Sequence, residues 1–108
     1  MDNHLRILHL EDEPDYSGLI KLMLEEAGFR VEITLVDSYA DFVTALNRQP
    51  FDLILADYNL PTCNGRQALE EALKYCSDTP FIIVSGMIGE QAAIESLKHG
   101  ATDYVLKQ

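Results

Sequence analysis

The sequence predicts an α/β fold built around a doubly wound, five-stranded parallel sheet. Two observations lead to this prediction. Short apolar segments alternate with segments of helical periodicity along the 108 residues, with short connections between them. Residues 53–56 and 80–84 are apolar throughout, which is typical of strands covered on both faces. Such a chain forms parallel strands with right-handed crossovers and helices on both faces of the sheet.

Five segments are expected to form the strands. The second alternates apolar and polar side chains from Phe29 to Leu35, so one of its faces is exposed and we place it at a sheet edge. This placement favours the strand order 2-1-3-4-5. The expected strands cover residues 5–10, 29–35, 53–56, 80–84 and 103–106.

Four segments have the apolar spacing of helices. The first should begin near Pro14, because proline is favoured in a first helical turn, and stop at Gly28. Its apolar stripe comprises Leu19, Leu22, Met23 and Ala27. The other helices are expected between Ser38 and Pro50, over residues 65–75 and over residues 90–99. The third of the four should turn Ala68, Leu69, Ala72 and Leu73 inward.

The composition excludes several classes of protein. Hydrophobic residues make up 47% of the chain, as in a globular domain. Eight Lys and Arg residues against 18 Asp and Glu residues give a formal net charge of −10, which argues against non-specific nucleic-acid binding. Because no apolar stretch could span a membrane and no secretion signal is present, we expect a cytoplasmic protein. Cys63 and Cys76 are expected to be free thiols.

We expect one domain over residues 1–108, truncated at its C-terminus. The sequence stops where the fifth strand ends, whereas a doubly wound sheet normally has a further helix over that edge. Either the chain was cut from a longer one, or another surface covers this part of the sheet.

Reactive side chains follow four of the five expected strands. Glu11 and Asp12 follow the first strand, Asp57 the third, Ser85 the fourth and Lys107 the fifth. Because the carboxyl ends of parallel strands lie along one edge of a sheet, these side chains should converge there.

This set of side chains suits phosphoryl chemistry. Carboxylates about 4 Å apart repel each other by about 4 kcal/mol at an effective dielectric constant of about 20, and a divalent cation removes that repulsion. Oxygen ligands without a nearby histidine favour Mg²⁺ or Mn²⁺ over zinc. Lys107 and the Ser85 hydroxyl could then hold phosphoryl oxygens, which leaves Asp57 as the nucleophile.

Each feature alone has a more ordinary interpretation. An acidic triplet before a proline is usually a helix N-terminus, an acid after a strand is usually part of a solvated turn, and a terminal lysine usually lies on the surface. Their occurrence together at four matching strand ends favours a functional site.

The sequence resembles the receiver domains of bacterial two-component response regulators along essentially its whole length. The resemblance implies the flavodoxin-like topology with order 2-1-3-4-5. The segments that carry it are Ile7–Glu13, Leu53–Asp57 with Pro61 and Gly65, Ile82–Gly86, and Gly100–Lys107.

The resemblance implies a role for each residue of the acidic group. Asp57 would accept a phosphoryl group from the phosphohistidine of a histidine kinase or phosphotransfer protein. Glu11 and Asp12 would bind Mg²⁺ together with Asp57 and the backbone carbonyl of Asn59. The domain would be a signalling module that promotes its own phosphorylation and dephosphorylation, rather than an enzyme.

The resemblance also implies a switch. Lys107 would pair with the phosphorylated aspartate, and Ser85 would contact the phosphoryl group and move on activation. Tyr104 would turn inward when Ser85 moves. The face around the fourth helix and the fifth strand would then signal to an output domain or protein, with homodimer formation on activation as a further option.

The sequence departs from the family pattern at two positions and leaves two rival functions open. Glu11 replaces the Asp often found first in the acidic pair, and Gln108 stands where a proline is usual. A pseudo-receiver that serves only as a docking module is one rival, and a small Mg²⁺-dependent phosphatase is the other. The second is disfavoured because Asn59, rather than an acid, lies two residues after Asp57. The histidines His4, His9 and His99 are expected to be structural or surface residues.

Overall fold

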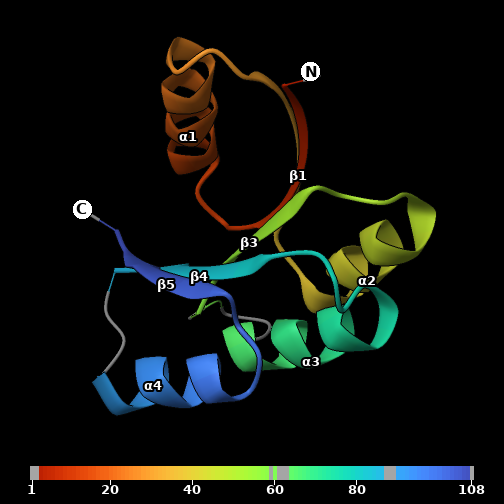
Figure 1. Cartoon of the computed structure of the whole chain (residues 1–108), viewed down its shortest axis with the longest axis vertical. Coiled ribbons are helices and arrows are strands. Elements are labelled where there is room, and N and C mark those ends of the chain that lie inside the picture. Colours follow the sequence, from red (N-terminus) through yellow and green to blue (C-terminus); the bar gives the residue numbers. More distant parts are fainter. Residues whose placement is uncertain (1–2, 59, 61–63, 87–89, 108) are drawn as a thin grey trace.

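The computed structural model describes residues 3–58, 60, 64–86 and 90–107, in which strands and helices alternate along the chain (Figure 1). The strands are β1 (His4–Leu10), β2 (Arg30–Val36), β3 (Leu53–Asp57), β4 (Phe81–Ser85) and β5 (Asp103–Leu106). The helices are α1 (Pro14–Glu26), α2 (Tyr39–Arg48), α3 (Gly65–Tyr75) and α4 (Glu90–Lys98). Each element expected from the sequence is therefore present, with bounds close to those expected.

The strands form one parallel sheet in the order β2-β1-β3-β4-β5, which confirms the predicted topology. Neighbouring strands end almost level with one another. The register pairs Leu10 with Ala56, Asp57 with Val84, and Ser85 with Leu106. The residues that end or follow β1, β3, β4 and β5 therefore share one edge of the sheet.

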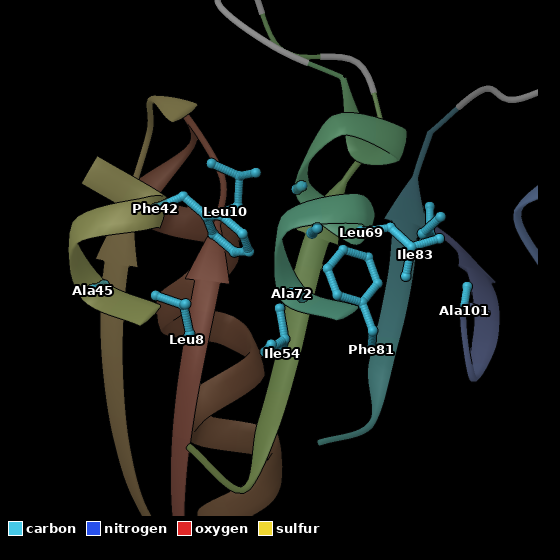
Figure 2. Packing of buried hydrophobic residues seen from close by; sticks show 12 residues of the cluster. Leu8, Leu10, Phe42, Ala45, Ile54, Leu69, Ala72, Phe81, Ile83 and Ala101 are labelled. Atoms are coloured by element: carbon cyan, nitrogen blue, oxygen red, sulfur yellow. The ribbon is translucent and has the colours of Figure 1, made fainter. Parts of the chain in front are cut away.

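The larger buried cluster lies on the face of the sheet covered by α2 and α3, on the side opposite α1 (Figures 1 and 2). The rings of Phe42 and Phe81 fill this cluster and are at most 2% exposed. Its other members include Leu8, Leu10, Ile54, Leu69, Ala72, Ile83 and Ala101. Since side chains alternate along a strand, the same strands turn their remaining residues to α1.

The smaller buried cluster lies between the sheet and α1. Its buried members are Ile7, Val31, Leu55 and Val84. Partly buried residues of α1 that pack against it are Tyr16, Ile20 and Leu24. These three residues recur at intervals of four, so they form one stripe along the helix.

The predicted inner stripe of α1 is wrong. Leu19, Leu22 and Met23 are 50%, 51% and 60% exposed and are not among the residues that pack against the smaller cluster. The reason is that α1 carries two apolar stripes with helical spacing, and spacing alone does not distinguish them. The inward stripe lies beside Ser17, which is buried and shares a hydrogen bond with the His9 side chain of β1, at 2.9 Å between Oγ and Nδ1.

The inward face of α3 was predicted correctly except at its end. Ala68, Leu69 and Ala72 are buried, but Leu73 is 36% exposed. Leu73 lies against the turn before β5, where a β-carbon on Gly100 would come within 3.0 Å of its Cδ1. Gly100 has φ of +117°, the left-handed conformation in which glycine commonly ends a helix.

No helix follows β5 in the part of the chain that the structure describes, as the sequence led us to expect. Among the described residues, no helix is both long and apolar enough to cross a membrane.

Candidate functional site

Glu11 is the most deeply buried acid of the site. It follows β1, and its backbone N–H donates a hydrogen bond to the Val36 carbonyl at 2.9 Å, which continues the β1–β2 pairing. Its side chain has no exposed surface. The Glu13 backbone N–H donates to Oε2 at 3.1 Å, and the Lys107 ammonium lies 2.7 Å from the buried Oε1. Both oxygens of the Glu11 carboxylate are therefore held by protein groups.

Asp57 ends β3 and is 7% exposed. The Lys107 ammonium donates a hydrogen bond to its Oδ2 at 3.0 Å and lies 2.7 Å from Oε1 of Glu11, as an ion pair. Lys107 is positioned by its own backbone, because its N–H donates to the Ser85 carbonyl at 2.9 Å and so extends the β4–β5 pairing. The ends of β1, β3 and β5 thus converge on one group of charges.

Three carboxylates of this group could hold a cation. One oxygen each from Glu11, Asp12 and Asp57 can lie within 4.8 Å of the others. The donor set is all oxygen, and the three carboxylates carry more negative charge than the single Lys107 ammonium beside them, so a cation would neutralise the remainder. Asp12 is exposed, so the group is open to solvent on that side. The residues fit Mg²⁺; the expected fourth ligand, Asn59, lies outside the described residues.

The pKa values of the site reflect this crowding. Burial raises the pKa of Glu11, and the neighbouring Lys107 offsets only part of that effect. Burial alone would lower the pKa of Lys107, but its hydrogen bonds and charge attraction with Glu11 and Asp57 outweigh burial and raise that pKa above its usual range. The lysine therefore stays charged and partly neutralises the two acids.

Ser85 and Tyr104 lie on the other side of the sheet from Glu11 and Asp57. Ser85 ends β4 and is 2% exposed, in alternation with the buried Ile83. Tyr104 of β5 is partly buried and packs against the larger cluster. Since Ile83 pairs with Tyr104 in the β4–β5 register, Ser85 and Tyr104 belong to the same face of neighbouring strands.

Two residues lie beside the site whose contacts with it were not predicted from the sequence: Tyr16, and His9, which was expected only to be structural or on the surface. The Lys107 ammonium lies over the Tyr16 ring, 4.7 Å from its centroid. His9 is fully buried beneath the site, where burial and then the charge of Lys107 lower its pKa to about 4. A tyrosine and a serine in the first turns of a helix that starts beside the acidic triplet were the available signal for such contacts.

Four of the predicted site residues therefore lie close together, whereas Ser85 and Tyr104 face the larger cluster. The structure joins Glu11, Asp57 and Lys107 directly and places Asp12 within reach of both acids. This arrangement offers a carboxylate nucleophile, a cation site and an ammonium group at one edge of a parallel sheet. Such a combination suits attack on an anionic phosphoryl group.

Comparison with known proteins agrees with this chemistry. Residues 7–108 match the family described as the response regulator receiver domain. The curated relatives include the cell cycle response regulators CtrA of Brucella ovis and Brucella anthropi, each 33% identical over 103 residues that make up 95% of this chain. The match covers 44% of either relative, so this chain spans less than half the length of those proteins.

Solved structures show the same fold. The receiver domain of the sensor histidine kinase PA1611 from Pseudomonas aeruginosa, with a magnesium ion in its active-site cleft, is 29% identical with a TM-score of 0.78, over 96% of this chain and 85% of that one. A response regulator from Hahella chejuensis is 28% identical with a TM-score of 0.86, over 95% of this chain and 80% of that one.

Proposed function

The chain belongs to the response regulator receiver domain family, and we propose that it is a Mg²⁺-dependent phosphoacceptor in which Asp57 takes a phosphoryl group from a histidine kinase or phosphotransfer protein. One observation above all supports this proposal. The Asp57 carboxylate lies at the carboxyl edge of the sheet, bonded to Lys107 and within reach of Glu11 and Asp12.

The reaction follows from the chemistry of Asp57. One carboxylate oxygen attacks the phosphorus of a phosphohistidine, a P–O bond forms, the P–N bond breaks, and the imidazole keeps the electron pair. Glu11 and Asp12 would hold Mg²⁺ with Asp57, and the bound ion would neutralise the carboxylates and the phosphoryl oxygens. Lys107, already charged and hydrogen-bonded to Asp57, would pair with an oxygen of the product.

The switch proposal rests on the opposite face of the sheet. Ser85 would move toward the phosphoryl group, and Tyr104 would fill the space that it leaves. Tyr104 packs against the larger cluster and belongs to β5, which contacts α4, so its movement would change the surface of β5 and α4. That face would signal to an output domain or protein, with homodimer formation on activation as one route.

Intact mass tests the proposed function directly. We expect one added phosphoryl group after incubation with Mg²⁺ and acetyl phosphate, and none with EDTA or in Asp57→Asn. Two results together would favour a pseudo-receiver that acts by docking alone: the wild-type protein gains no phosphoryl group, and Mg²⁺ does not change its free energy of unfolding. Repeated turnover of a phosphomonoester would instead favour a phosphatase.

A further inference from the structure

The Lys107 ammonium has unlike neighbours on its two sides. On one side lie Glu11 at 2.7 Å, Asp57 at 3.0 Å and Glu13 at 3.7 Å. On another side lies the face of the Tyr16 ring, 4.7 Å from the ammonium to the ring centroid. Within about 6 Å, the negative face of an aromatic ring attracts a cation.

The Tyr16 ring is held in place by its surroundings. The backbone N–H of Tyr16 donates a hydrogen bond to the Glu13 carbonyl at 3.1 Å in the first turn of α1. The ring packs against the smaller buried cluster, and its centroid lies 6.3 Å from that of the His9 ring. His9 is itself fully buried and shares a hydrogen bond with Ser17, so α1 is tied to β1 directly beneath the tyrosine. The Tyr16 ring is therefore fixed in position, and the flexible Lys107 side chain can pack against it.

The Lys107 side chain is long and flexible, so contact with the Tyr16 ring restricts its conformation. This side chain has four rotatable carbons, and Lys107 is the last residue that the structure describes, beyond the end of β5. The lysine side chain is only 14% exposed, so its ammonium has exchanged most of its water for protein contacts. An aromatic face is one of the few apolar surfaces that can cover an ammonium without repelling it.

We infer that Tyr16 is a positioning residue for the phosphoacceptor site: the face of its ring holds the Lys107 ammonium against Asp57 and Glu11. The inference rests on the proposed function, because it gives Lys107 its part in phosphorylation. The ring itself touches neither the phosphoryl group nor the cation in this role. Its contribution is to keep Lys107 in the orientation that the phosphorylated aspartate requires.

The experiment compares Tyr16→Phe with Tyr16→Leu. Phenylalanine keeps the aromatic face and loses only the hydroxyl, whereas leucine keeps the apolar packing and loses the face. We expect the initial rate of phosphorylation by acetyl phosphate, at saturating Mg²⁺, to fall about three- to tenfold in Tyr16→Leu and to stay within about twofold in Tyr16→Phe. In the background of Lys107→Ala, Tyr16→Leu should have no further effect, because the partner of the ring is gone.

A control on the same helix separates positioning from general packing. Ile20 lies one turn farther along α1 and packs against the same cluster. Ile20→Ala should lower stability while leaving the phosphorylation rate of the folded protein near that of wild type. Equal losses of rate in Ile20→Ala and Tyr16→Leu would overturn the inference, since both changes would then act through the packing of α1.

Proton NMR tests the contact without any phosphorylation. Protons on the Lys107 Cε should be shifted upfield by the ring in the wild type and in Tyr16→Phe, with the signal assigned by its loss in Lys107→Ala. An unshifted Lys107 signal in the wild type would overturn the inference, and this measurement does not require Tyr16→Leu to fold. If the wild type took no phosphoryl group but showed the shift, the proposed function would fail while the contact would stand.

In the rate experiment, a phosphorylation rate in Tyr16→Phe as low as that in Tyr16→Leu would assign the effect to the hydroxyl and refute the role of the ring.

Discussion

The two faces of the sheet differ in what they bury. Under α2 and α3, the cluster of 12 residues shown in Figure 2 is entirely apolar. Under α1, the buried apolar cluster is smaller, and the same side of the sheet holds buried polar groups: His9 with Ser17, and Glu11 with Asp57. One face thus supplies most of the packing, and the other places charges near the edge where strands end.

This division follows from alternation along the strands. In β3, Ile54 and Ala56 face the larger cluster, while Leu55 and Asp57 face α1. In β4 the last residue falls on the opposite side, so Ser85 faces the larger cluster. The proposed acceptor carboxylate and the proposed switch residues are therefore on opposite faces of one edge, so a signal that started at Asp57 would have to pass around the end of the sheet.

The largest difference between the faces should appear on truncation of their side chains. Phe42 is fully buried, so Phe42→Ala should lower the free energy of unfolding by about 3–5 kcal/mol. Leu24 on the other face is only partly buried, and Leu24→Ala should lower it by less than about 2 kcal/mol. Urea denaturation measures both values, and equal losses would contradict the division of packing between the faces.

A second test uses pH, because only the face under α1 buries a histidine. The unfolded chain protonates His9 near its ordinary pKa of 6.5, whereas the folded chain does so near pH 4. Between these values the unfolded state binds more protons, so stability falls as the pH falls, by roughly 3 kcal/mol from this group.

His9→Leu is the matched variant for this measurement, made without added metal. It removes the titrating group but keeps an apolar side chain of similar size. We expect its free energy of unfolding to fall less than that of the wild type between pH 7 and pH 4. Parallel curves for the two proteins would show that His9 does not titrate as its burial requires.

A third test addresses the edge where the two faces meet. Mg²⁺ that binds only the folded chain should raise the free energy of unfolding by about 2.7 kcal/mol at a free concentration 100-fold above its dissociation constant. Asp12→Asn should need more Mg²⁺ for the same gain, because it removes a carboxylate from the cation site. Thermal melts over a Mg²⁺ series give both curves, and Asn47→Ala in the exposed part of α2 serves as the control. Coincident curves for wild type and Asp12→Asn would remove Asp12 from the site.

The sequence was sufficient to predict the arrangement of the strands and the meeting of Glu11, Asp57 and Lys107 at one edge of the sheet. Alternation from Phe29 to Leu35 indicated the edge strand, and the acids after buried strands indicated the edge at which they meet. It was not sufficient for α1, where two apolar stripes have the same spacing and the choice between them depends on tertiary contacts. The contacts of Tyr16 and His9 with the site were not predicted for the same reason: each forms only when α1 packs on β1.

The smallest expected effect comes from the bond that ties these two elements together. Ser17→Ala removes the hydroxyl that shares a hydrogen bond with Nδ1 of His9, and the Nε2 of that histidine has no hydrogen-bond partner among the described residues. The variant should lower the free energy of unfolding by about 1–3 kcal/mol, since the imidazole stays buried with one bond fewer. Because the same bond fixes α1 beneath Tyr16, hydrogen exchange in the first turn of α1 should accelerate as well, while exchange in α3 stays unchanged. Faster exchange in both helices would mean that the bond supports the whole fold rather than the face beside the site.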